Sequence, residues 1–110
     1  MALKINPAPA FEFDAQLTVP GAAQPATVRV TARHKGREAL AAWMESAAGS
    51  TDPAFLGAVF SGWAGVLDAD GAEVPFSPEA LARLLDAYPA AGRELLEQYL
   101  AALTESRRKN

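Results

Sequence analysis

The sequence contains no cysteine, and histidine occurs once, as His34. The first absence excludes disulfide bonds, zinc–thiolate sites, iron–sulfur clusters and thiol catalysis together. No hydrophobic run approaches the roughly 20 residues that a membrane-spanning helix needs. The first residues also lack the apolar core of a signal peptide. We therefore expect a cytoplasmic protein that is not bound to a membrane.

Basic residues are scarce, because 10 Lys and Arg face 13 Asp and Glu and give a formal net charge of −3. A general nucleic-acid-binding surface needs excess positive charge to displace counterions from phosphate, so nucleic acid is not an expected partner. The length of 110 residues fits one domain with a modest core. We expect residues 1–9 to form a flexible leader, residues 10–106 to form the single domain, and residues 107–110 to form a basic tail.

Two segments near the N-terminus alternate between apolar and polar residues, which is the period of a half-buried strand. The apolar positions are Phe11, Phe13, Ala15, Leu17 and Val19 in the first segment and Val28, Val30 and Ala32 in the second. Turn residues between Pro20 and Pro25 separate the two segments. This pattern predicts an antiparallel hairpin with its apolar face on helices and with acids opposite arginines on its polar face.

After the hairpin the apolar residues follow the spacing i, i+3, i+4, i+7, which is typical of amphipathic helices. Four such stripes occur, at Leu40, Trp43, Met44 and Ala47; Leu56, Val59, Phe60 and Trp63; Leu81, Leu84, Leu85 and Tyr88; and Leu96, Tyr99, Leu100 and Leu103. The pattern predicts an α+β fold in which an N-terminal antiparallel β-hairpin is followed by about four helices.

The expected helix ends follow from capping chemistry. Asp52 and Ser77 are each followed by proline, the combination of an N-cap and a first helical residue that needs no N–H partner. Gly49 is placed to end the first helix, and Gly62 and Gly65 are placed to end the second.

The residues from Val66 to Phe76 form an expected turn segment, with a tight hairpin or a single added strand. Its centre, Asp68 to Gly71, resembles a calcium loop only superficially. Such a loop needs acidic residues at its first and twelfth positions, where this sequence has Val66 and Ser77. A plain Asp–Gly turn is therefore the expectation.

No combination of residues points to catalysis. The nucleotide-binding glycine motifs and the G-x-S-x-G nucleophile motif are missing from the sequence. His34 stands beside Arg33 and Lys35, which is typical of a solvated basic edge. We therefore assign no catalytic, metal-binding or cofactor-binding residue, and we expect a non-enzyme without a cofactor.

Aromatic residues supply the candidate site instead. Trp63 lies between Gly62 and Gly65 at the expected end of a helix, where a large ring is partly exposed. The alternative for such a residue is ordinary core packing. We hypothesise that Trp63 and the nearby Phe76 rim an apolar surface that binds a partner protein.

The second half of the chain resembles a family of small tail assembly chaperones of long-tailed phages and prophages. The resemblance rests on the order and spacing of Ala42–Met44, Gly62–Val66, Asp68–Gly71, Val74–Ser77, Glu79–Leu85, Tyr88–Pro89, Tyr99–Leu100 and Arg107–Asn110. Together with the hairpin, it extends from about residue 10 to the end.

The resemblance implies a non-catalytic protein of the host cell cytoplasm that binds the tape-measure protein, keeps it soluble and helps to recruit the tail-tube protein. It leaves open whether the chain forms a homo-oligomer. The alternatives are a structural tail-completion or connector protein of the virion and a small DNA-binding regulator of a mobile element.

The resemblance also implies two products from one start by programmed frameshifting. The codons of Lys109 and Asn110 can read AAA AAC, a run on which paired tRNAs slip back by one base. We predict a minor, longer product that shares residues 1 to about 108; a merely polar tail is the alternative. The gene sequence provides the test, because the minus-one frame must stay open past the stop codon. An immediate stop in that frame would contradict the prediction and leave the family resemblance untouched.

Overall fold

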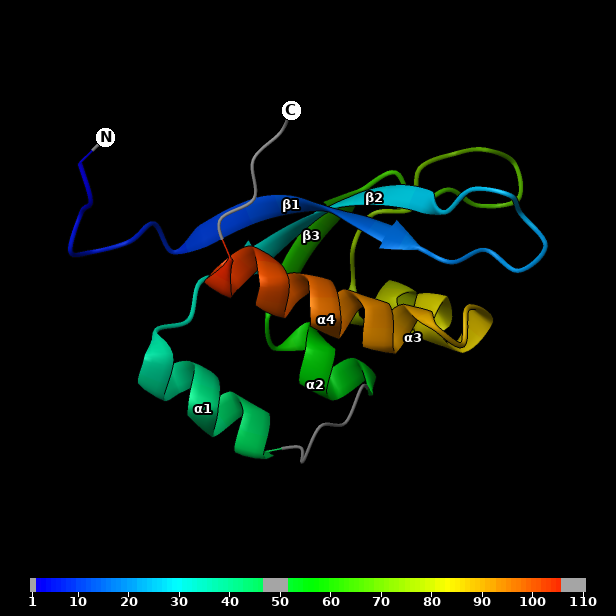
Figure 1. Ribbon diagram of the computed structural model, residues 1–110. Coiled ribbons are helices and arrows are strands. Elements are labelled where there is room, and N and C mark those ends of the chain that lie inside the picture. The colour runs from blue at the N-terminus through cyan, green and yellow to red at the C-terminus, as the bar shows by residue number, and fades with distance from the viewer. Residues whose placement is uncertain (1, 47–51, 106–110) are drawn as a thin grey trace.

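The structure, a computed structural model, describes residues 2–46 and 52–105. Its elements are β1 (Ala10–Leu17), β2 (Ala26–Arg33), α1 (Arg37–Ser46), α2 (Pro53–Gly57), β3 (Phe60–Ala64), α3 (Pro78–Ala87) and α4 (Ala91–Thr104). The strands form one antiparallel sheet in the order β1-β2-β3, and the helices lie on one side of it (Figure 1). This arrangement confirms the predicted α+β fold and its N-terminal hairpin.

The hairpin has the predicted faces. Ala15, Leu17, Val28 and Val30 are buried on the side of the helices, with Phe11 and Phe13 half-buried beside them. On the opposite face the guanidinium of Arg29 lies 3.3 Å from a carboxylate oxygen of Glu12 and 3.3 Å from one of Asp14. These cross-strand pairs were expected, but their exposure limits each to a small contribution to stability, about 0–1 kcal/mol.

The two predicted N-caps are also confirmed. The Asp52 carboxylate accepts a hydrogen bond of 2.8 Å from the backbone N–H of Phe55, and the Ser77 hydroxyl accepts one of 3.0 Å from that of Ala80. A proline follows each cap at the start of α2 and of α3. The expected helix end at Gly49 lies outside the described residues.

The predicted second helix is wrong beyond Gly57. The helix α2 ends there, and the chain continues as β3, which pairs with β2. In this pairing Phe60 is opposite Ala32 and Gly62 is opposite Thr31, so that the register shifts by one residue at Ser61. The third strand of the sheet is therefore β3, and it precedes the Asp–Gly turn segment in which an added strand was considered.

The register shift explains why the sequence pattern was misleading. Successive side chains of a regular strand point to opposite faces, so residues three apart do not share a face. A bulge adds one residue and restores a shared face for Phe60 and Trp63. Both rings consequently pack on the core side of the sheet. Their spacing of three residues is the spacing that an amphipathic helix would show.

The core centres on Tyr99 of α4, whose exposed fraction is 0%. Its ring stacks on Phe11 at a centroid distance of 6.0 Å and meets the rings of Trp43 and Phe60 edge-on at 5.6 and 5.8 Å. Its hydroxyl donates a hydrogen bond of 2.8 Å to the backbone carbonyl of Arg33. One side chain thus joins α4 to α1 and to each strand of the sheet.

Side chains of α4 also bond to the outer edge of β1. The backbone N–H of Gln16 donates to Oε1 of Gln98 at 2.7 Å, and Nε2 of Gln98 donates to the backbone carbonyl of Gln16 at 2.8 Å. Past the end of the strand, the backbone N–H of Thr18 donates to the Glu94 carboxylate at 2.9 Å. Glu94 and Gln98 are one helical turn apart, so both reach the same strand.

Alkaline unfolding provides a test of the buried Tyr99. Burial raises the pKa of Tyr99 from 10.0 to about 12. Between these values the unfolded chain loses the phenolic proton while the folded chain keeps it, so this contribution to stability is complete below pH 10.0 and is lost as the pH rises toward about 12. We predict that Tyr99→Phe removes this part of the alkaline decline. At neutral pH it costs about 0.5–1.5 kcal/mol, because the hydrogen bond to Arg33 is lost.

Urea unfolding of both chains from neutral pH to about pH 11 makes the comparison. Lysines and the second tyrosine, Tyr88, are present in both chains, so their titration cancels in the difference. Parallel pH profiles for the two chains would contradict the prediction.

Candidate functional site

The structure brings the two predicted site residues into direct contact. Strand β3 places Trp63 opposite Val30, on the side of the sheet that faces the helices. The Trp63 and Phe76 rings meet edge-on at a centroid distance of 5.0 Å and an angle of 88°. The indole N–H donates a hydrogen bond of 2.7 Å to the backbone carbonyl of Val74. Both rings are half-buried against the core, and their role in partner binding stays a prediction.

The chain between these two residues turns back on itself. Gly65, directly after β3, has a φ of +97°, which residues with a side chain rarely adopt. A Cβ atom there would also lie only 3.2 Å from the carbonyl oxygen of Thr27, so both the backbone conformation and the available space favour glycine. Farther on, one carboxylate oxygen of Asp68 accepts hydrogen bonds from the backbone N–H groups of Asp70 and Ala72, at 2.9 and 3.0 Å. The predicted Asp–Gly turn is confirmed, and this carboxylate stabilises the turn.

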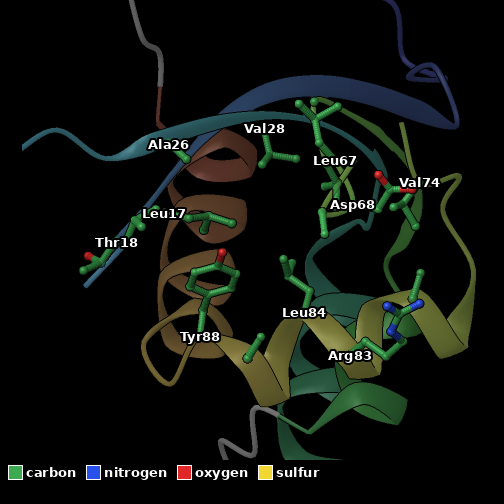
Figure 2. A pocket seen from close by; sticks show the side chains of 16 residues that line it. Leu17, Thr18, Ala26, Val28, Leu67, Asp68, Val74, Arg83, Leu84 and Tyr88 are labelled. Atoms are coloured by element: carbon green, nitrogen blue, oxygen red, sulfur yellow. The ribbon is translucent and has the colours of Figure 1, made fainter. Parts of the chain in front are cut away.

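This segment forms one wall of an apolar pocket of about 380 Å³. In Figure 2, Leu17 and Val28 of the sheet and Leu84 and Tyr88 of the α3 region surround the same hollow, and Leu67 lies across it from Leu84 and Tyr88. The pocket is lined by Leu17, Thr18, Val19, Ala26, Val28, Gly65, Val66, Leu67, Asp68, Ala69, Val74, Ala80, Arg83, Leu84, Ala87 and Tyr88.

The pocket and the aromatic pair are neighbours. The lining residues do not include Trp63 and Phe76, but they include Val74, whose carbonyl accepts the hydrogen bond of the Trp63 indole. The aromatic pair is therefore tied to the wall of the pocket through Val74. The volume lies in the range of ligand pockets in proteins, about 300–1,000 Å³.

The sequence did not reveal the pocket. Leu17 and Val28 were expected on the core face of the hairpin, and Leu84 and Tyr88 on the stripe of a helix. These residues belong to elements that do not touch one another fully at this end of the sheet. The hydrophobic pattern of each segment shows which face is apolar, but it does not show whether another segment covers that face. One signal was available in the sequence, namely the apolar Leu67 directly before the Asp–Gly turn. In the structure this residue is 57% exposed.

The remaining chemistry of the described residues is limited. Residues 2–46 and 52–105 contain no group of three or more His, Asp or Glu side chains that could hold a metal ion. In the same ranges, no helix has the length and hydrophobicity to cross a membrane. His34 is exposed, and its backbone N–H donates to the carbonyl of Pro9 at 2.9 Å. The site is suited to covering apolar side chains, with Thr18, Asp68 and Arg83 as polar neighbours.

The described residues thus form a small α+β domain with an apolar pocket and a half-buried aromatic pair. The sequence model of the phage tail assembly chaperone family matches residues 1–110, the whole chain. The chain therefore belongs to this family, as the resemblance indicated, and membership implies a chaperone role rather than an enzymatic one. Comparisons with curated proteins and with solved structures gave no significant match.

The two tryptophans allow a matched stability test of the site. Trp63→Phe keeps an aromatic ring beside Phe76 and removes the hydrogen bond to Val74, so we predict a loss of about 0.5–1.5 kcal/mol in unfolding free energy. Trp43→Phe is the control. It removes a similar bond of 3.1 Å to the Phe55 carbonyl, but from a ring that is 7% exposed and stacked on Phe55 at 4.1 Å.

We expect the control to cost more than Trp63→Phe, because substitution at the more deeply buried position also leaves a cavity. Urea unfolding at neutral pH measures both. A larger loss for Trp63→Phe would show that Trp63 is the stronger core residue and would argue against its role as a binding surface.

Proposed function

We propose that this protein is a tail assembly chaperone that binds the tape-measure protein of a phage or prophage in the host cytoplasm and assists assembly of the tail-tube protein around it. The family match over residues 1–110 carries the proposal. A tape-measure protein is a long, mostly helical chain whose apolar stripes are exposed until the tube encloses it. Exposed apolar surface of this extent favours aggregation unless a partner covers it.

The properties of the surface support this role. Trp63 and Phe76 are half-buried residues that pack against the core without being fully covered by it. Aromatic residues of this kind are enriched at protein–protein interfaces, where they supply apolar area and, for tryptophan, a polar atom. The indole N–H already bonds to Val74, so binding of an apolar side chain against the ring does not leave this N–H unpaired. We therefore place the contact with the tape-measure protein at the rim formed by Trp63 and Phe76.

Release after assembly requires a contact of modest affinity. A small number of anchoring side chains provides most of the binding energy of an interface. This contact has two aromatic anchors, Trp63 and Phe76, and so few anchors give it a modest affinity. The net charge of −3 keeps the free chaperone soluble while it carries an apolar site.

Co-expression with a tape-measure fragment tests the function. We expect the chaperone to raise the soluble fraction of the fragment several-fold, with an unrelated acidic protein of similar size as the control. An insoluble fragment in both cases would contradict the proposed function. A connector protein would remain in the particle, so detection of this chain in purified virions by mass spectrometry would favour that alternative.

The same complex tests the site through fluorine NMR of chains labelled with 5-fluorotryptophan. We expect the Trp63 resonance to shift when the fragment binds and the resonance of the buried Trp43 to stay in place, so each sample contains its own control. A soluble complex in which Trp63 does not shift would retain the function and place the contact elsewhere.

A further inference from the structure

The described residues expose three large apolar side chains, and they lie in two separate places. Leu3 and Ile5 of the leader are 97% and 94% exposed, and Leu67 on the pocket wall is 57% exposed. A single exposed apolar residue is common on protein surfaces. Leu3 and Ile5 are two residues apart, so in an extended conformation they share one side of the chain. The leader therefore carries an apolar pair without a covering surface, and the pocket is an apolar hollow.

We propose that the leader, residues 2–9, of one copy of this chain inserts Leu3 and Ile5 into the apolar pocket of a second copy. The volume is sufficient: an apolar cavity of about 150 Å³ holds a benzene-sized group, and this pocket measures about 380 Å³. Docking would cover all three exposed apolar side chains at once, since Leu67 lines the pocket. Removal of this apolar surface from water supplies the driving force for docking.

A leader cannot fill the pocket of its own chain. It joins β1 at Ala10, whereas the pocket is lined by Leu17 at the other end of the strand. The strand is about 23 Å long at roughly 3.3 Å per residue. When fully extended, the chain spans at most about 18 Å from Ala10 back to Ile5 and about 25 Å back to Leu3, so the two side chains cannot both reach the Leu17 end of their own chain. The side of β1 along which the leader would have to return is covered by α4, so the pocket of a second copy is the available one.

Charge around the pocket favours one orientation of the leader. The wall formed by the Asp–Gly turn carries Asp68, with Asp70 and Glu73 in the same turn, and the α3 wall carries Arg83. Lys4 stands between Leu3 and Ile5 and points to the opposite side in an extended chain. When Leu3 and Ile5 are in the pocket, Lys4 lies at its mouth. There the acidic turn attracts the Lys4 ammonium and Arg83 repels it, so the leader binds with Lys4 toward the Asp–Gly turn.

Disulfide trapping tests the proposal directly, because the chain has no cysteine of its own. One batch carries Ala2→Cys, next to the intact Leu3 and Ile5. A second batch carries Ala87→Cys in the lining of the pocket. A third carries Ala42→Cys on α1 as the matched control, since Ala42 and Ala87 are both exposed helical alanines. The first batch is mixed with the second or with the third under mild oxidation. Each chain then carries a single cysteine, so every disulfide joins two chains.

We expect Ala2→Cys to crosslink with Ala87→Cys at least about tenfold faster than with Ala42→Cys, because a docked leader holds its thiol near the pocket at a millimolar effective concentration. Adding Leu3→Ser and Ile5→Ser to the Ala2→Cys chain should abolish the difference. Both positions are fully exposed, so these changes leave the fold intact.

Equal rates with the two partners would overturn the proposal. So would an unchanged preference for Ala87→Cys in the Leu3→Ser and Ile5→Ser chain. If the rates are equal and a tape-measure fragment shields Ala87→Cys from a thiol reagent, the pocket belongs to the tape-measure protein. The leader assignment then fails, while the proposed chaperone function stands.

Discussion

The side chain of Tyr99 sets the relative positions of most of the other elements. Its ring contacts Phe11 of β1, Trp43 of α1 and Phe60 of β3, and its hydroxyl bonds to the carbonyl of Arg33 at the end of β2. A buried phenol needs a polar partner within reach, and ring contacts of this kind have preferred geometries. Few placements of α4 against the sheet satisfy both requirements. The sheet, α1 and α4 are therefore held as one unit.

The features that the sequence predicted correctly are local. The alternation in β1 and β2 and the caps at Asp52 and Ser77 depend on residues that are close together in the chain. Strand β3 depends instead on a partner strand about 30 residues earlier, and a bulge at Ser61 gives it helical spacing. Pairing with β2 outweighed the helical pattern, because β3 completes the sheet and brings Phe60 against Tyr99. The number of helices was nevertheless correct, since α2 forms as a short helix before the strand.

The candidate site was predictable to a similar extent. Trp63 and Phe76 were linked in the sequence by a turn segment with residues that reverse the chain, and the structure brings their rings together. The pocket next to them combines the ends of β1 and β2, the turn segment and α3. Its existence depends on the distance between α3 and the sheet, which reflects the packing of the whole domain. Patterns of single segments carry no information on that distance.

The bonds between α4 and β1 have a consequence for a protein proposed to work beside an unassembled partner. An edge strand with free backbone groups can recruit another chain by β-pairing and so start aggregation. At Gln16 the amide of Gln98 occupies both the N–H and the carbonyl, much as a neighbouring strand would. Glu94 occupies the next outward-facing N–H, that of Thr18, and adds a negative charge there. This end of β1 is thereby closed to strand addition, so a chain that meets the domain at this point must be held by its side chains, from which it can still be released.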